Sequence, residues 1–153
     1  MAGTTREQIS VALFNLVSAA TGNVVGLVTS DRRARAFTDV TPAEMPALFI
    51  EELPEDYEHT FEKMLKLPPK RTMKYTIALY LSDHQESSVV PMTQMNAMID
   101  AIETALAPDA VTGGQSLGGL VAEARIDGKI DKFENVENSG KSVALLPIAV
   151  LRP

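Results

Sequence analysis

The stretch Arg71–Leu81 alternates apolar and polar side chains, and this alternation restricts the chain to folds that contain a β-sheet with a buried face. The apolar positions are Met73, Tyr75, Ile77, Leu79 and Leu81, and the positions between them include Thr72, Lys74, Thr76 and Tyr80. Successive side chains of a strand point to opposite sides of its sheet. The apolar side therefore needs a second layer of structure to cover it.

Two amphipathic helices, one on each side of this strand in the sequence, are predicted to supply that layer. The capping-box pattern Thr4-Thr5-Arg6-Glu7 predicts a helix over 5–20 that ends before Gly22. A second helix is predicted between Pro91 and Pro108. Its apolar stripe consists of Met92, Met95, Met98, Ile99, Ile102, Ala105 and Leu106. A methionine stripe at this spacing is typical of core packing rather than of a ligand site.

Further segments have the composition of strands: Val24–Thr29, Ala47–Ile50, Val121–Phe133 and Val143–Leu151. Residues 51–70 fit either a pair of strands or a loose helix. In the last strand, Pro147 has no backbone N–H to donate, so we expect this strand at an edge of the sheet or with a bulge. Such an apolar edge is covered either by a partner subunit or by Pro147 and the helices.

The order of these segments is helix, strands, helix, strands, with short connections between consecutive strands. It predicts an α+β fold: a mostly antiparallel β-sheet with two amphipathic helices packed on one face. The length of 153 residues fits a single domain over 1–153. No apolar run approaches the roughly 20 residues of a membrane helix, and residues 1–8 lack the pattern of a signal peptide. We expect the chain to fold in the cytoplasm of its maker.

The segment Gly114-Gln115-Ser116-Leu117-Gly118 matches the G-x-S-x-G pattern that surrounds the nucleophile of many serine hydrolases. That nucleophile lies on a sharp turn between a strand and a helix, with its histidine later in the sequence. Ser116 instead follows a helix and precedes a strand, and His59 and His84 both come before it. We therefore interpret the glycines as a loop that turns the chain from the second helix into the next strand.

Other signatures of chemistry are incomplete in the same way. Gly140-Lys141-Ser142 lacks the earlier glycine of a phosphate-binding loop, because that position is Asn135, and a strand follows it. The chain has no cysteine and only two histidines. An acidic cluster lacks the ligand spacing of a calcium loop and consists of Glu51, Glu52, Glu55, Asp56 and Glu58. We expect no catalytic residue, no metal site and no cofactor.

Charged side chains form two groups that suit a protein interface. Three arginines, Arg32, Arg33 and Arg35, follow the first predicted strand and are expected to face carboxylates within the chain or on a neighbour. One face of the 121–133 strand alternates in charge through Glu123, Arg125, Asp127, Lys129 and Asp131. With a net charge of −6 and no tryptophan, the chain makes a weak case for binding nucleic acid.

The chain resembles the tail terminator proteins of long, non-contractile-tailed bacteriophages and related prophages. The resemblance rests on Arg6–Phe14, on Arg32-Arg33 with Pro46–Phe49, on Leu67–Lys70, on Asn96–Pro108 and, closest of all, on Thr112–Val121. It covers most of the chain but excludes residues 51–66 and 131–140. These motifs are structural and carry no catalytic residue.

The resemblance implies a structural virion protein that forms a hexameric ring on the last ring of the tail tube. Such a ring stops tail polymerisation and presents a surface for head–tail joining, at the head-proximal end of the virion tail. Its partners are copies of itself, the tail tube protein and the head–tail connector proteins. DNA passes through the lumen without specific binding, and no membrane, cofactor or enzymatic activity is involved.

The two groups of charged side chains lead to a hypothesis about the subunit contacts of the ring. A ring needs a heterologous interface, in which one face of a subunit meets a different face of the next. We expect Arg32, Arg33 and Arg35 to lie near a subunit or tube interface, facing acidic patches such as 51–58. The 123–129 group is expected to take part through Glu123, Arg125, Asp127 and Lys129. Two alternatives remain: another neck or tail-completion protein of similar fold, and a small enzyme or ligand-binding domain with a defined pocket.

Overall fold

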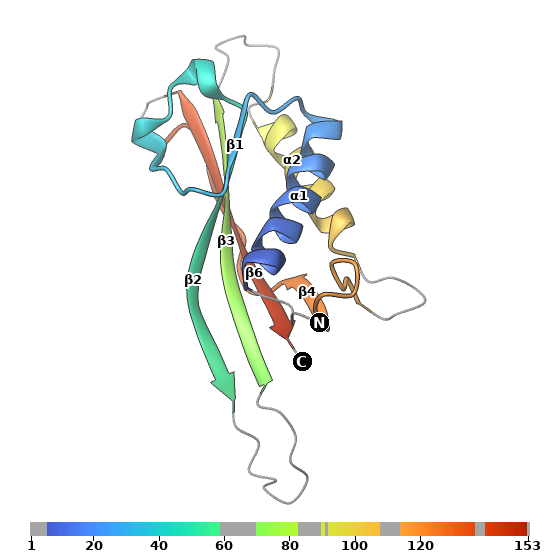
Figure 1. Cartoon of the computed structure of the whole chain (residues 1–153). Helices are drawn as coiled ribbons and strands as arrows, with labels where there is room; N and C mark the ends of the chain where they lie inside the picture. The colour runs from blue at the N-terminus through green and yellow to red at the C-terminus, as the bar shows by residue number, and fades with distance from the viewer. Residues whose placement is uncertain are drawn as a thin grey trace, which may run out of the picture.

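The computed structural model describes residues 6–58, 70–82, 90, 92–107, 114–136 and 140–152. Its helices are α1 (Arg6–Val24) and α2 (Met92–Ala105), with short 3-10 turns at Phe37–Asp39 and Pro42–Glu44. Its strands are β1 (Thr29–Asp31), β2 (Ala47–Glu58), β3 (Lys70–Ser82), β4 (Glu123–Ile126), β5 (Asp131–Phe133) and β6 (Lys141–Arg152). Figure 1 shows both helices on one side of a long, twisted sheet.

The six strands form one mixed sheet in the order β1-β2-β3-β6-β4, and β5 also pairs with β6. β1 runs parallel to β2, and the other pairings are antiparallel. β3 pairs with the whole of β6, from Arg71 opposite Arg152 to Ser82 opposite Lys141. The predicted α+β class with a mostly antiparallel sheet is confirmed.

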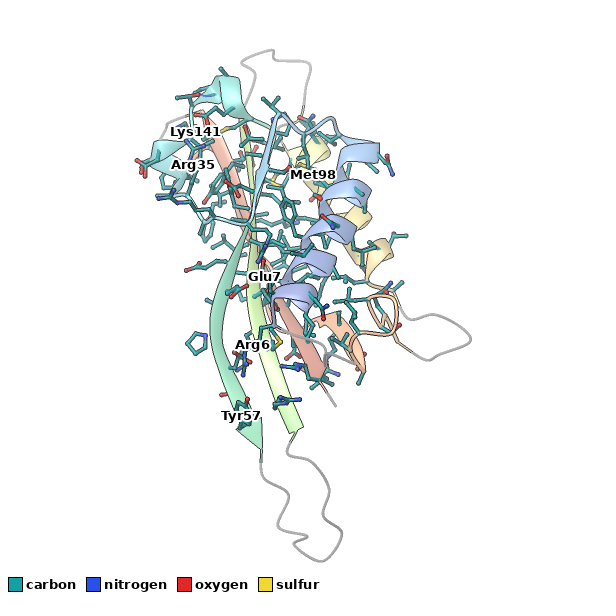
Figure 2. All side chains as sticks on the ribbon, in the orientation of Figure 1. Arg6, Glu7, Arg35, Tyr57, Met98 and Lys141 are labelled. Atoms are coloured by element: carbon teal, nitrogen blue, oxygen red, sulfur yellow. The ribbon has the colours of Figure 1, made fainter. Side chains whose placement is uncertain are left out.

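The main core lies between the sheet and the two helices. α1 buries Ile9, Leu13 and Val17 against it, and α2 buries Met95, Met98 and Ile102. The predicted apolar positions of 71–81 all belong to this core, so the face assignment of that strand is confirmed. Figure 2 shows Met98 among the side chains beside the helices.

A smaller core lies on the opposite face of the sheet, at the end where the chain enters β2. Its buried members are Val40, Met45, Ala47, Phe49, Tyr80 and Val143. Tyr80, which the alternation places on the polar side of its strand, packs here against Phe49 with ring centroids 5.6 Å apart. The segment 36–46 therefore covers part of the face that the helices leave open.

The first helix is longer than predicted, and the prediction of a strand over 24–29 is wrong. α1 continues through Gly22 to Val24, and only Thr29 of the predicted strand lies in β1. The backbone N–H of Val25 still donates to the carbonyl of Thr21, 2.9 Å away. Glycine inside a helix lowers its stability without ending it when the flanking turns are packed, and Val17 and Thr21 are both buried.

The strand predicted over Ala47–Ile50 extends to Glu58. Residues 47–50 are buried because Leu48 and Ile50 face the main core and Ala47 and Phe49 face the smaller one, whereas much of 51–57 is exposed. β1 pairs only with Ala47–Phe49 and leaves the rest of β2 at the sheet edge. A β-bulge lies between Leu53 and Asp56, where Pro54 is tolerated because an edge strand has no ladder on its outer side. Of the two alternatives for 51–70, the described residues are strand, and 59–69 lie outside the described residues.

The predicted long strand over 121–133 is two strands, β4 and β5, with a break at 127–130. Gly128 has φ +124°, a conformation that interrupts a regular strand. Both pieces pair with β6, and Ala124, Ile126 and Ile130 still face the main core. Apolar and charged residues alternate through 127–130 as they do in the strands on either side, so the sequence pattern did not indicate the break.

Of the two expectations for the last strand, the edge position is wrong, because β6 lies between β3 on one side and β4 and β5 on the other. The irregularity at Pro147 lies instead in the facing segment 127–130, between β4 and β5. Pro147 is opposite Thr76 of β3, and its carbonyl oxygen accepts the N–H of Asp127 at 2.9 Å. The N and the carbonyl of one residue point to the same side of an antiparallel strand. The missing N–H of Pro147 therefore faces the break between β4 and β5, where no ladder bond is required.

Candidate functional site

The loop that holds Ser116 serves the fold. The backbone carbonyl of Ser116 accepts the N–H groups of Gly119 and Val121 at 3.1 Å each, and its hydroxyl accepts the N–H of Gly119 at 3.1 Å. Gly118 and Gly119 have positive φ, as expected for a loop of this composition, and so does the buried Leu117. Gly113, His59 and His84 lie outside the described residues.

Gln115 connects this loop to the elements on either side of it. Its side-chain amide donates to the carbonyl of Ala105 at the end of α2, 2.9 Å away. Its backbone carbonyl accepts the N–H of Ala124 in β4 at 2.8 Å. The loop therefore fixes the C-terminal end of α2 to the β4 edge of the sheet.

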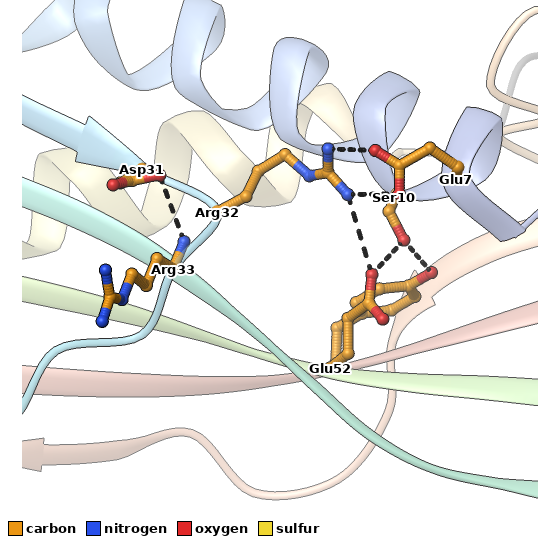
Figure 3. A network of polar contacts seen from close by, with 7 residues as sticks. Glu7, Ser10, Asp31, Arg32, Arg33 and Glu52 are labelled. Atoms are coloured by element: carbon orange, nitrogen blue, oxygen red, sulfur yellow. Dashed lines mark hydrogen bonds and ion pairs between the residues drawn. The ribbon is translucent and has the colours of Figure 1, made fainter.

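Arg32 joins the first helix to the edge strand of the sheet (Figure 3). Its guanidinium donates to both carboxylate oxygens of Glu7 in α1 and lies 3.9 Å from Glu52 in β2. The hydrogen bond from Arg32 lowers the pKa of Glu7 below its ordinary value. Glu7, expected in a capping box with Thr4, thus binds Arg32, and Thr4 lies outside the described residues.

The buried hydroxyl of Ser10 extends this network from Glu52 toward the main core. Ser10 donates to Glu52 and lies 3.0 Å from the hydroxyl of Tyr75 in β3. Both residues are about 1% exposed. Burial raises the pKa of Tyr75, so its phenol stays protonated at neutral pH. The network therefore runs from the surface at Arg32 into the main core.

A second arginine makes a similar connection further along β2. The guanidinium of Arg6 donates to Glu55 at 2.7 Å and to the hydroxyl of Tyr57 at 2.9 Å. Figure 2 shows Arg6 and Tyr57 where β2 extends past the start of α1. Part of the acidic 51–58 patch is therefore neutralised within the chain by α1.

Arg35 lies on the other side of the sheet, over the smaller core. It donates to Glu44 at 2.7 Å and to the carbonyl of Asp39 at 2.8 Å, and its guanidinium carbon lies 5.7 Å from the centre of the Phe49 ring. Hydrogen bonds from Arg35 and from Thr41 lower the pKa of Glu44 to about 2. Arg35 thus holds the 36–46 segment on the sheet.

Arg33 differs from its two neighbours. Its backbone N–H donates to Asp31, and Figure 3 shows its side chain pointing away from the network around Arg32. Its guanidinium has no partner among the residues that the structure describes. The arginine group predicted as one site is thus divided among two intrachain ion-pair sites and one exposed cation.

The alternating charges of the β4–β5 region largely pair with one another. Arg125 lies 3.5 Å from Glu123 and 3.9 Å from Asp127, and Lys129 lies 3.3 Å from Asp131. These ion pairs lie beside β6 on the edge of the sheet opposite β1. The two predicted interface groups are therefore brought to opposite edges of the sheet, and the structure does not bring them together within one chain.

Shallow depressions at three positions were not predicted. One, of about 500 Å³, lies between α1 and α2 and is lined by Ala20, Val24 and Ala101 among others. Another, of about 280 Å³, lies beside Arg35 and is lined by Phe49, Glu51, Thr76 and Tyr80 among others. Two adjoining depressions of about 390 and 420 Å³ lie between α2 and residues 126–132, and share Ile130. Sequence patterns could not reveal them, because their walls come from segments that meet only in the fold.

Within the described ranges, no cluster of three or more histidine, aspartate or glutamate residues is arranged to hold a metal ion. No described helix is both long enough and apolar enough to cross a membrane. The polar contacts at Arg6, Arg32 and Gln115 join secondary-structure elements, whereas those of Arg35 hold the 36–46 segment and those of Ser116 close its own loop. The surfaces left for function include the two edges of the sheet and the groove beside α2.

No protein-family model matches the chain, and no curated protein matches it. Among solved structures, 24 chains match. One is a chain from the virion of a native gene transfer agent particle, with a TM-score of 0.50 and 15% sequence identity. The match covers 94% of this chain and 92% of that chain, so the two share a fold over nearly their whole length.

Proposed function

We propose that this chain is a structural virion protein that caps the tail tube of a long-tailed phage as a hexameric ring. The ring terminates tail polymerisation and provides the surface for head–tail joining. The observation that carries the proposal is the fold shared over 94% of the chain with a chain of a gene transfer agent virion. The resemblance to tail terminators, carried most closely by Thr112–Val121, supports the specific position in the tail.

The placement of the charged groups supports a ring. In a closed ring each subunit uses two different faces, one toward each neighbour. Arg32, Arg33 and Arg35 follow β1 at one edge of the sheet, and Glu123 to Lys129 line the other. Neighbouring copies can therefore meet edge to edge, with a different edge contributed by each.

The partners follow from this position. The ring contacts the tail tube protein on one side and the head–tail connector proteins on the other. DNA passes through the lumen without specific binding, and the net charge of −6 suits a wall that does not hold phosphates. The protein acts at the head-proximal end of the virion tail, after assembly in the host cytoplasm, and catalyses no reaction.

A neck or tail-completion protein of similar fold is the second candidate. The structural likeness to the gene transfer agent chain, at 15% identity, supports a common fold alone and does not favour one position in the particle over another, because the same fold can serve at several positions. An enzyme or ligand-binding domain is the weakest candidate. It needs an enclosed pocket with convergent polar groups, whereas the depressions beside α2 are open and combine isoleucines with Asn96, Asp100, Glu103 and Lys132.

Electron microscopy of tails assembled with and without the protein distinguishes these candidates. Overlong tails in its absence are the result expected for a terminator. Tails of normal length that fail to join heads would instead favour the neck protein. Normal particles without the protein would exclude both structural functions.

Charge reversal gives a second test. Arg33→Glu is expected to block tail completion while the fold stays intact, as judged by circular dichroism and thermal unfolding. Arg32→Glu and Arg35→Glu test the same interface less cleanly, because each also breaks an ion pair within the chain. Unchanged particle assembly with Arg33→Glu would count against this part of the interface.

A further inference from the structure

Most charged groups at the proposed interfaces already have partners within the chain. Arg32 binds Glu7, and Arg35 binds Glu44. Arg125 lies between the carboxylates of Glu123 and Asp127. Arg33 is exposed, and its guanidinium has no partner among the described residues. An exposed cation on an otherwise paired edge is available to a carboxylate of another molecule.

The same edge also carries an exposed apolar side chain. Val28 immediately precedes β1, and 60% of its surface is exposed although its backbone N–H is held by the carbonyl of Pro46 at 2.9 Å. Val28 and Arg33 therefore flank β1, the three-residue strand that ends the sheet. We call the segment 28–33 the β1 rim.

The opposite edge of the sheet has a groove of matching chemistry. It runs between α2 and residues 126–132, and the apolar side chains along it are Ile99, Leu106, Ile126 and Ile130. Asp100 and Glu103, which also line it, are exposed on α2. Neither carboxylate has a partner among the residues that the structure describes. The groove thus offers apolar walls beside two unpaired carboxylates, and Lys132, the cation that lines it, donates to Asn96 of α2 at 3.3 Å.

We infer that the groove between α2 and residues 126–132 receives the β1 rim of a second copy of this chain. Val28 enters between Ile126, Ile130 and the helix, and Arg33 binds Asp100 and Glu103. This inference rests on the proposed ring and specifies its subunit contact. It names two carboxylates on α2 in place of the 123–129 charges, whose basic members Arg125 and Lys129 are paired within the chain.

A copy of the same chain fits this groove for two reasons. The rim and the groove are complementary in charge and in apolar character, and charge complementarity selects one orientation of docking. They also lie at opposite edges of one sheet, so each copy offers a rim to one neighbour and a groove to the other. Such a heterologous contact closes into a ring when the rotation between copies permits.

Cysteine cross-linking in assembled tails tests this contact directly, because the chain contains no cysteine. A variant with Arg33→Cys and Glu103→Cys is treated with a short bis-maleimide and run on a denaturing gel. A ladder of covalent oligomers is expected. Each single variant and the matched pair Lys74→Cys with Glu103→Cys should remain monomeric, because Lys74 lies in an interior strand of the sheet.

A charge swap provides the second measurement. Arg33→Glu is expected to lower incorporation into tails by about tenfold or more, as is typical when one partner of an interface ion pair is reversed. Adding Asp100→Arg and Glu103→Arg to the same chain should restore incorporation, since every interface then regains opposite charges. Lys74→Glu, which reverses a half-exposed cation in the interior strand β3, away from the rim and the groove, serves as the control and should have little effect.

The outcomes separate this contact from the proposed function. Tails that end at normal length and contain the protein, but give no ladder with the double-cysteine variant, would overturn the contact and leave the terminator function standing. Failure of the charge swap to rescue would also overturn the contact. Tails of normal length that never contain the protein would overturn the proposed function itself.

Discussion

Gly128 lies against the ring of Pro147, across the boundary between the broken edge of the sheet and its neighbouring strand β6. A Cβ added to Gly128 would lie 3.3 Å from Cγ of Pro147. Ile126 pairs with Ile148 and Asp131 with Leu145, so residues 127–130 lie opposite 146–147 alone. The extra residues form the break, and the glycine allows the chain to pass close to the proline.

Gly128→Ala should therefore destabilise the protein. Its φ of +124° is unfavourable for any residue with a side chain, and the added methyl group would also press on Pro147. Strain of this kind costs about 1–3 kcal/mol. The free energy of unfolding, measured by urea denaturation, should fall by that amount. Gly26→Ala is the control: its Cβ would meet no atom within 4 Å, and a change within about 0.5 kcal/mol is expected. Equal stability of the two variants would contradict the prediction.

Gly22→Ala should have the opposite effect. Gly22 lies inside α1, and a Cβ there would meet nothing within 4 Å. Alanine in a helix interior is more favourable than glycine by about 0.8–1 kcal/mol. The melting temperature and the free energy of unfolding should both rise. A decrease in either would mean that the helix does not continue through residue 22 in solution.

Glu44 should make part of the stability depend on acid pH. Its pKa in the fold is about 2, below the ordinary 4.5, because Arg35 and Thr41 stabilise the carboxylate. A carboxyl group whose pKa is lowered by folding stabilises the fold at pH values above its ordinary pKa of 4.5. This stabilisation is lost as the pH falls from about 4.5 toward 2. Glu44→Gln should flatten the pH dependence of unfolding in that window.

The cause of that shift can be checked by NMR titration of the Glu44 carboxyl group. Arg35→Met removes the main hydrogen bond and should move the midpoint upward, toward the ordinary value. A midpoint unaffected by the substitution would show that Arg35 does not determine the pKa of Glu44.

Ser10 and Tyr75 should be energetically coupled. Their hydroxyl oxygens lie 3.0 Å apart, and both side chains are buried. Ser10→Ala leaves the Tyr75 hydroxyl without this partner, at a cost of about 1–3 kcal/mol. With Tyr75→Phe already present, the same change should cost less. A double-mutant cycle measures the difference, and strictly additive effects would argue against the contact.

Much of the fold was predictable from local patterns. The alternation of 71–81 predicted β3 and its buried face, and the apolar stripe of 92–106 predicted α2. Both patterns follow from the repeat of the backbone, and both segments pack against the main core. The end of α1 and the extent of β2 were missed, because neighbouring elements decide where a helix or strand stops.

The candidate site was less predictable. The sequence indicated that the arginines after the first strand bind carboxylates, but Glu7, Glu44 and Asp39 come from three separate segments. Only the fold decides that Arg32 faces α1, that Arg35 faces the smaller core, and that Arg33 faces neither. The groove beside α2 left no pattern in the sequence, since its walls come from α2 and from residues 126–132.

The sequence by itself determined which residues are apolar, at what period they recur, and that Ser116 lacks the strand–turn–helix setting of a nucleophile. The tertiary structure decided which strand is central, where the long charged strand breaks, and which charges remain unpaired. The physical reason is that periodicity reflects burial along one element, whereas strand order and ion pairing depend on contacts between distant segments. Pro147 illustrates the difference: its missing N–H is a property of the residue, but its harmless position beside the break at Gly128 exists only in the folded sheet.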